Sequence, residues 1–86
     1  MNIDELRRQI DSIDDELLNL FENRMEITKE IRQYKKEKGL PIKDPERERI
    51  ILGRLCKKTR PELAEYVKAL FSALIEISVN YQSQNF

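Results

Sequence analysis

Residues 2–38 contain neither glycine nor proline, and this uninterrupted stretch restricts the fold more than any other feature. It is rich in Leu, Ile, Glu, Lys and Arg, which are all compatible with a helix. Gly39 is a C-terminal stop signal, and Leu40 and Pro41 follow it. The sequence therefore predicts one helix of about 36 residues, which is about 54 Å long at 1.5 Å per residue.

Two shorter helices are predicted after this stop signal. Asp44-Pro45-Glu46 combines an N-cap residue, a proline at the first helical position and an acid in the first turn, and begins a helix that runs to about residue 57. Thr59-Arg60-Pro61-Glu62 begins a third helix, which continues to about residue 84. No useful stretch alternates as a strand does. We therefore predict an all-α fold with one long, one short and one medium helix in a single domain over residues 1–86.

The long helix does not fit within the globule that 86 residues form. A compact chain of this length has a radius of gyration near 12 Å, and so a diameter of roughly 30 Å. One alternative is a break into a hairpin near Asn23, but nothing there resembles a turn. The two shorter helices cannot cover the long one alone. We therefore expect an intertwined helical homodimer, in which a second copy supplies the missing cover.

Composition argues against several functional classes. The 16 basic and 16 acidic residues give no net charge, whereas nucleic-acid binders usually show a basic excess. No stretch approaches the roughly 20 apolar residues of a membrane span, and the N-terminus has no signal-peptide core, so a cytoplasmic protein is expected. The chain has no histidine, and its one cysteine, Cys56, lies in an apolar helical pattern typical of a small buried residue. Neither a metal site nor a nucleophilic cysteine is predicted.

Arg24 interrupts an apolar seam along the long helix. A charge on a buried seam needs a partner or a function. It either sets the register of a dimer by pairing with an acid across the interface, or it binds an anion. Lys35 lies eleven residues later, on the same face and about 16 Å away, so that the two cations can bracket a small anion. The seam comprises Ile3, Leu6, Ile10, Ile13, Leu17, Leu20, Arg24, Ile27, Ile31 and Tyr34.

Polar residues also stand on the apolar faces of the two shorter helices. The simplest explanation is a capped helix start for the first group, Asp44, Arg47 and Glu48, with local ion pairs. Ser78 and Gln82 lie one turn apart, and the simplest explanation for this pair is a helix end that emerges into water. The functional alternative is that both groups face one pocket.

Arg7 is the remaining candidate, about 25 Å before Arg24 along the long helix. One small ligand cannot contact both arginines within one chain. It can do so across an antiparallel dimer, where the first half of one long helix lies beside the second half of its partner.

These residues carry a family resemblance. In the stretches LRRQIDSID, ENRMEITKEIRQYK, IKDPERERI and IEISVNYQ, the chain resembles the all-helical AroQ class of chorismate mutases over nearly its whole length. The resemblance implies a homodimer with two sites, each completed by an arginine of the other chain. It also implies a cofactor-independent isomerase of the shikimate pathway, which rearranges the dicarboxylate chorismate to prephenate for phenylalanine and tyrosine biosynthesis. The site residues that it implies are Arg7, Arg24, Lys35, Asp44, Arg47, Glu48, Ser78 and Gln82.

The chemistry of this rearrangement suggests a role for most of these residues. Arg24 and the Arg7 of the partner chain are expected to clamp the carboxylates, and Ser78 to bind a carboxylate beside them. Lys35 and Gln82 are expected to donate to the ether oxygen, and Glu48 to accept from the ring hydroxyl with Arg47 positioning it. Two alternatives stay open: an isochorismate-pyruvate lyase on the same fold, which Glu48 disfavours, and a non-enzymatic helical dimerisation module.

Overall fold

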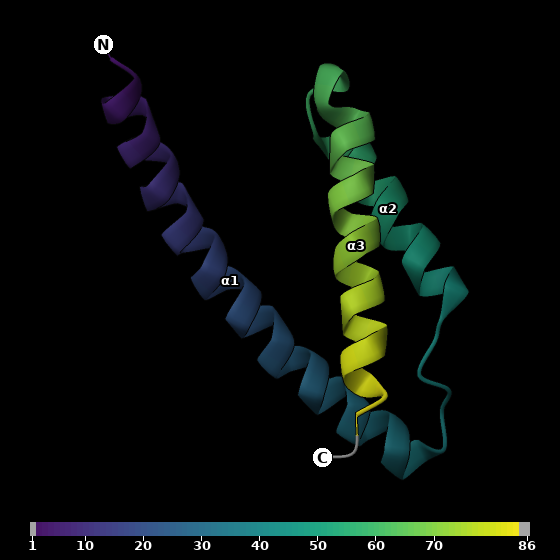
Figure 1. Cartoon of the computed structure of the whole chain (residues 1–86). Helices are drawn as coiled ribbons and strands as arrows, with labels where there is room; N and C mark the ends of the chain where they lie inside the picture. The colour runs from purple at the N-terminus through teal and green to yellow at the C-terminus, as the bar shows by residue number, and fades with distance from the viewer. Residues whose placement is uncertain (1, 85–86) are drawn as a thin grey trace.

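The computed structural model describes residues 2–84 as three α-helices (Figure 1). They are α1 (Ile3–Lys38), α2 (Pro45–Lys58) and α3 (Ala64–Gln82), and a short 3-10 turn, η1 (Pro61–Leu63), leads into α3. The predicted all-α fold with a long, a short and a medium helix is confirmed. The sequence did not predict η1, and α3 begins three residues after Pro61, the first helical position that the start signal indicates.

α1 is a single helix of 36 residues with a cap at each end. The side chain of Asn2 accepts a hydrogen bond of 2.9 Å from the backbone N–H of Glu5. At the other end Gly39 takes the left-handed conformation, with φ of 66°, and its N–H points to the carbonyls of Lys35 and Lys36. Because the helix passes through Asn23 without interruption, the hairpin alternative is wrong.

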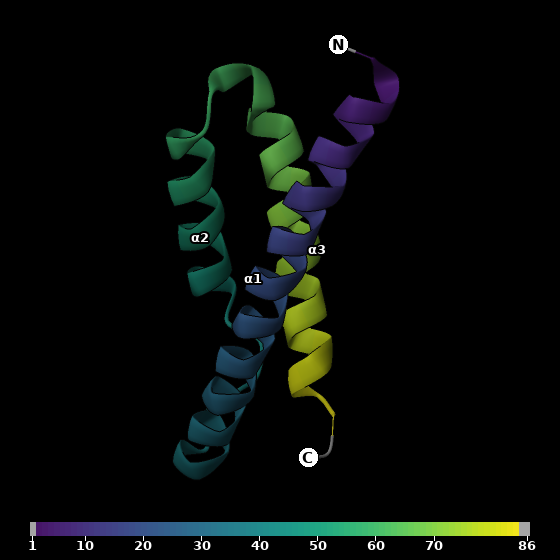
Figure 2. The same cartoon turned by 90° about the vertical axis from the view of Figure 1, so that its left-hand side faces the viewer.

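α2 and α3 form an antiparallel hairpin, and α1 contacts α3 only through its C-terminal half (Figures 1 and 2). The N-terminal half of α1 diverges from the hairpin, so the chain has the shape of an open V (Figure 1). Its radius of gyration is 16.0 Å, against about 12 Å for a compact chain of this length. Cys56 is half-buried in the hairpin, where its thiol lies 3.8 Å from the carbonyl oxygen of Ala64.

The apolar seam of α1 is uncovered in the described chain. Its six members before Arg24 are between 39% exposed, at Leu6, and 64% exposed, at Leu20. Ile27, Ile31 and Tyr34 continue this exposed row toward the C-terminal end of the helix. A contiguous apolar row of this length marks an interaction surface. None of the helices within residues 2–84 has both the length and the hydrophobicity needed to cross a bilayer.

The buried residues of the described chain are few and mostly polar. Only Thr28, Ile75, Ser78 and Gln82 are buried between residues 2 and 84, and Ile75 alone is apolar. All four lie where the C-terminal half of α1 meets α3. Since burying a polar group is unfavourable unless it is hydrogen-bonded, this concentration of polar side chains points to a functional site.

Candidate active site

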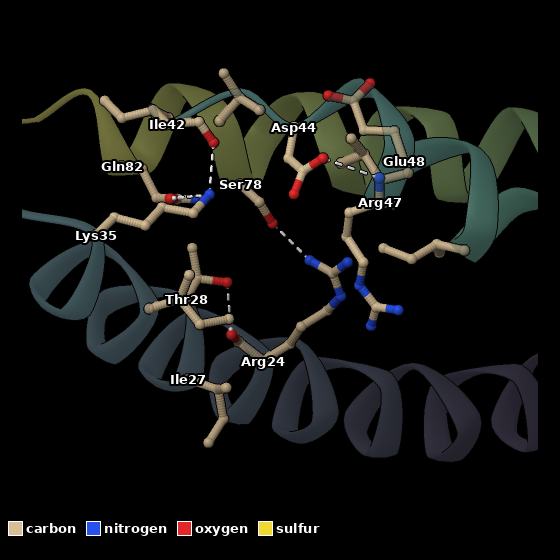
Figure 3. A pocket seen from close by; sticks show the side chains of 14 residues that line it. Arg24, Ile27, Thr28, Lys35, Ile42, Asp44, Arg47, Glu48, Ser78 and Gln82 are labelled. Carbon is tan, nitrogen blue, oxygen red and sulfur yellow. Dashed lines mark hydrogen bonds between the residues drawn. The ribbon is translucent and has the colours of Figure 1, made fainter. Parts of the chain in front are cut away.

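A cavity of about 460 Å³ lies between the C-terminal half of α1, the loop that precedes α2, the first turns of α2 and the C-terminal half of α3 (Figure 3). Its walls are partly apolar, which is typical of small-molecule sites. The apolar lining residues are Ile27, Ile31, Ile42, Ile51, Ile75 and Val79. The cavity brings together every predicted site residue except Arg7: Arg24, Lys35, Asp44, Arg47, Glu48, Ser78 and Gln82.

The lining carries an excess of positive charge, although the whole chain has no net charge. Arg24, Lys35 and Arg47 face two carboxylates, Asp44 and Glu48. No carboxylate of residues 2–84 lies within ion-pair distance of any of these three cations. Figure 3 shows the guanidinium groups of Arg24 and Arg47 extending into the same space between α1 and α2. Like charges that converge in this way favour an anionic ligand between them.

Arg24 reaches across the cavity from α1 to α3. Its Nη1 donates a hydrogen bond of 2.5 Å to Oγ of Ser78 (Figure 3). Arg24 is half-buried and Ser78 is buried, so this contact lies largely away from solvent. The charge on the seam is therefore directed into the cavity, where its partner within the chain is a neutral hydroxyl.

Lys35 and Gln82 meet at the end of the cavity near the loop (Figure 3). Nζ of Lys35 donates to the carbonyl oxygen of Ile42 at 2.6 Å and to Oε1 of Gln82 at 3.3 Å. An ammonium group has three protons, so one donor of Lys35 is left for a ligand. Gln82 uses its amide oxygen in this contact, and the amide group also carries two N–H donors. Two donors, one charged and one neutral, are thus available at the same place.

Asp44 has the capping role that its position in the sequence suggests. Its Oδ1 accepts a hydrogen bond of 3.1 Å from the backbone N–H of Arg47, and Pro45 occupies the first position of α2. Because Asp44 also lines the cavity, the cap and the charged wall are built from one residue. The predicted role of Asp44 as the N-cap of α2 is confirmed, and this role does not exclude contact with a ligand.

Glu48 is held by a residue that sequence analysis did not single out. Nζ of Lys43 donates to the two carboxylate oxygens of Glu48 at 3.0 and 3.3 Å. Figure 3 shows the carboxylate of Glu48 turned away from α1. The side chain of Lys43 is 64% exposed and that of Glu48 is 24% exposed, so the pair is weak and can open when a ligand competes for the carboxylate.

Thr28 and the carbonyl of Ile42 are further parts of the cavity that were not predicted from the sequence. Thr28 lies one turn after Arg24 and is on the same face, so a hydroxyl within the apolar stripe was the available signal. No signal marks Ile42 or Lys43, because the path of a loop is not encoded in a periodic pattern. Within residues 2–84, no three His, Cys, Asp or Glu residues are grouped as metal ligands.

Arg7 is not part of the cavity within this chain. It lies in the diverging arm of α1, where its Nη1 is 4.0 Å from Oδ1 of Asp4 and both side chains are more than 70% exposed. This placement agrees with the length argument, which excluded contact of one ligand with Arg7 and Arg24 of the same chain. A role for Arg7 at a site therefore requires a second copy.

The fold and the cavity define a class: all-helical proteins with a cation-lined pocket. Residues 6–83 match the family chorismate mutase type II, and the chain therefore belongs to that family. It is similar to the chorismate mutase of Methanocaldococcus jannaschii, with 37% identity over 83 residues that cover 93% of this chain and 83% of that protein.

Longer proteins contain a similar segment. The bifunctional chorismate mutase/prephenate dehydratase of Escherichia coli K12 is 37% identical over 76 residues, which are 86% of this chain and 20% of that enzyme. The corresponding enzyme of Aquifex aeolicus is 43% identical over 53 residues, which are 62% of this chain and 15% of that protein. The chain thus spans a fifth or less of these two bifunctional relatives and most of the Methanocaldococcus jannaschii protein.

Proposed function

We propose that this chain rearranges chorismate to prephenate in aromatic amino acid biosynthesis, as a cofactor-independent isomerase. The observation that carries the proposal is the convergence of seven polar residues, from three helices and a loop, on one cavity in a chain of this family. A module that only dimerises has no use for such a cavity. The names of the relatives, chorismate mutase and bifunctional chorismate mutase/prephenate dehydratase, support the same activity.

The reaction is a unimolecular Claisen rearrangement, in which one C–O bond breaks while one C–C bond forms. A protein accelerates such a reaction in two ways. It holds the substrate in the conformer that brings the two reacting carbons together. It also stabilises the negative charge that develops on the ether oxygen as the C–O bond breaks. Neither task requires a nucleophile.

Lys35 and Gln82 are the proposed donors to the ether oxygen. Nζ of Lys35 and Oε1 of Gln82 already lie 3.3 Å apart, and both side chains carry N–H donors beyond this contact. Gln82 is only 6% exposed, so its hydrogen bond to a developing charge acts in a region of low dielectric constant. A charged and a neutral donor that converge on one oxygen suit a transition state more negative there than the ground state.

Arg24 is the proposed clamp for one carboxylate of the substrate. A guanidinium group binds a carboxylate in a planar, two-point geometry, and each charge-assisted hydrogen bond contributes roughly 1.5–3 kcal/mol. Ser78 already accepts from Arg24 and would contact the same carboxylate. Asp44 and Arg47 would shape the charge of the opposite wall.

Glu48 is the proposed acceptor for the ring hydroxyl of the substrate. In the structure its carboxylate pairs with Lys43 and is turned away from α1 (Figure 3). Binding would therefore turn the Glu48 carboxylate inward, away from this exposed and weak pair. Arg47, one residue before it on α2, would support the inward position.

We further propose that the functional unit is an antiparallel homodimer in which Arg7 of each chain completes the site of the other. Three features support this assembly: the open V, the exposed seam of α1, and the position of Arg7 far from the cavity of its own chain. A second α1 laid along the seam would cover its apolar row. It would also bring its N-terminal half toward the cavity.

The proposed activity is tested by incubating the purified chain with chorismate and identifying the product. We expect prephenate, formed without added cofactor and in the presence of a chelator. Arg24→Gln should lower kcat/KM by at least about 10-fold, because it removes a charge-assisted hydrogen bond. Arg54→Gln is the matched control, since it removes one positive charge from an exposed position of α2 outside the cavity.

Two results would contradict the proposed activity. Release of pyruvate from isochorismate, with chorismate left unchanged, would identify the lyase that shares this fold. A folded protein that is inert toward both substrates would leave only a dimerisation function.

A further inference from the structure

Thr28 is the most buried residue that the structure describes, at 5% exposure, and the roles proposed above do not use it. It lies on α1 one turn after Arg24 and two turns before Lys35, and it lines the cavity between these two cations (Figure 3). A valine at this position would fill the same volume without burying a hydroxyl group. The presence of a buried hydroxyl therefore needs an explanation.

The hydroxyl of Thr28 has a hydrogen bond that it can give up. Oγ1 donates to the carbonyl oxygen of Arg24 at 2.9 Å. In an α-helix that carbonyl also accepts the backbone N–H four residues later, which is the N–H of Thr28 itself. Rotation of the hydroxyl away from the carbonyl therefore leaves no buried acceptor without a partner.

We propose that Thr28 is a substrate-binding residue, which donates its hydroxyl proton to the carboxylate that Arg24 clamps. Oγ1 stands beside the base of the Arg24 side chain, on the same wall of the cavity. A hydrogen bond from an O–H group to a carboxylate is roughly twice as strong as one to a neutral acceptor. The Thr28 hydroxyl keeps its proton, turns away from the Arg24 carbonyl and donates to the carboxylate when the ligand arrives.

A purely local role is the alternative. Hydroxyl groups in helices commonly bond to the carbonyl four residues earlier, and Ser83 does this to Val79 at 2.9 Å on the surface of the chain. Two features separate Thr28 from Ser83. Thr28 is buried whereas Ser83 is exposed. Thr28 also lines the cavity between Arg24 and Lys35, neither of which has an ion-pair partner within residues 2–84.

The experiment compares Thr28→Val, which keeps the shape and removes the hydroxyl, with Thr28→Ser, which keeps the hydroxyl. Ser83→Ala is the matched control, because it removes the same type of helical hydrogen bond outside the cavity. Each protein is assayed for kcat and KM with chorismate. Each is also titrated with an unreactive cyclic-ether dicarboxylate and with the two monoamides of that ligand. Unfolding midpoints show whether a variant is folded, and Thr28→Ala replaces Thr28→Val if the latter is not.

We expect Thr28→Val to weaken binding of the dicarboxylate by on the order of 10-fold, as loss of one hydrogen bond to a charged group does. Thr28→Ser and Ser83→Ala should bind as the unchanged protein does. The loss of affinity in Thr28→Val should disappear with one of the two monoamides. This is the monoamide in which an uncharged amide replaces the carboxylate that Arg24 clamps. That selectivity separates a direct contact from a general disturbance of the helix.

Two outcomes would overturn the proposal: equal binding of the dicarboxylate by Thr28→Val and the unchanged protein, or an equal loss for the dicarboxylate and both monoamides. The proposal rests on the proposed activity, but the two fail in different ways. An inert wild-type protein contradicts the activity, whereas the titrations still show whether Thr28 contacts a bound carboxylate.

Discussion

Arg24 and Thr28 lie one turn apart on the same wall of the cavity, yet only one of them stood out in the sequence. A charge on an apolar seam is anomalous at once, because an unpaired charge in an apolar interior is strongly unfavourable. Threonine is compatible with both a helix and a partly buried face, so the hydroxyl of Thr28 gives no comparable signal. At the scale of single residues, the sequence thus predicted the charged residues of the cavity and the neutral residues Ser78 and Gln82, and it missed Thr28.

Gln82 allows a test of the chemistry at this scale. A neutral amide donates at every working pH, whereas a carboxyl donates only when it is protonated, with an ordinary pKa of about 4.3 for glutamate. We therefore expect Gln82→Glu to be active at acidic pH and to lose activity as the pH rises and the carboxyl ionises. The measurement is kcat/KM against pH for this variant and for Gln84→Glu, which adds the same charge at an exposed position outside the cavity. Equal profiles for the two variants would show that Gln82 does not face the ether oxygen.

The helix ends were the most predictable elements, because their signals are local. Asp44 caps α2 and Gly39 ends α1, as their residue types indicate. The turn η1 was not predicted, since Pro61 fits the first position of an α-helix as well as that of a 3-10 turn. Immediately after this turn, the carbonyl oxygen of Ala64 lies 3.8 Å from the thiol of Cys56 on α2. A local sequence pattern does not report such a contact between two helices.

Replacing each of the two glycines by alanine should change the free energy of unfolding in opposite directions. Gly39 has φ of 66°, so Gly39→Ala should lower the free energy of unfolding by about 1 kcal/mol. Gly53 lies within α2, and a Cβ there meets no atom within 4 Å, so Gly53→Ala should raise the free energy of unfolding by about 0.5–1 kcal/mol. Urea denaturation at one protein concentration measures both.

The stabilities of the two glycine variants also test the cap of α1 and the exposure of α2. A neutral Gly39→Ala would contradict the left-handed cap of α1. A loss of stability in Gly53→Ala would show that another chain covers this face of α2 in the assembled protein, because the described chain leaves the space open.

At the scale of the whole molecule, the length of α1 was the decisive sequence feature. It predicted a helix too long for its own globule, and the chain is indeed an open V with a principal extent of 55 Å. Its exposed seam is what a missing partner would cover. The homodimer, the single domain over residues 1–86 and the cytoplasmic location stay predictions. The position of Arg7 within a partner's site depends on a second chain, which no pattern within one chain can fix.

The shared site can be tested by complementation. Arg7→Ala and Arg24→Ala should each be nearly inactive as homodimers, because every site then lacks one of its two proposed carboxylate clamps. When the two variants are unfolded together in equal amounts and refolded, random pairing gives about half heterodimers under two-fold symmetry. In each heterodimer one site combines the intact Arg24 of one chain with the intact Arg7 of the other. The second site carries both substitutions.

The refolded mixture should therefore recover roughly a quarter of the unchanged protein's activity, if the two sites act independently. Steady-state assays measure the recovery, and mass spectrometry of the intact assembly measures the share of heterodimers. Each variant refolded alone is the control, and it should recover nothing. If Arg7 and Arg24 served one site within one chain, no pairing would assemble an intact site. Heterodimers that are present but no more active than their parents would therefore exclude Arg7 as the donated arginine.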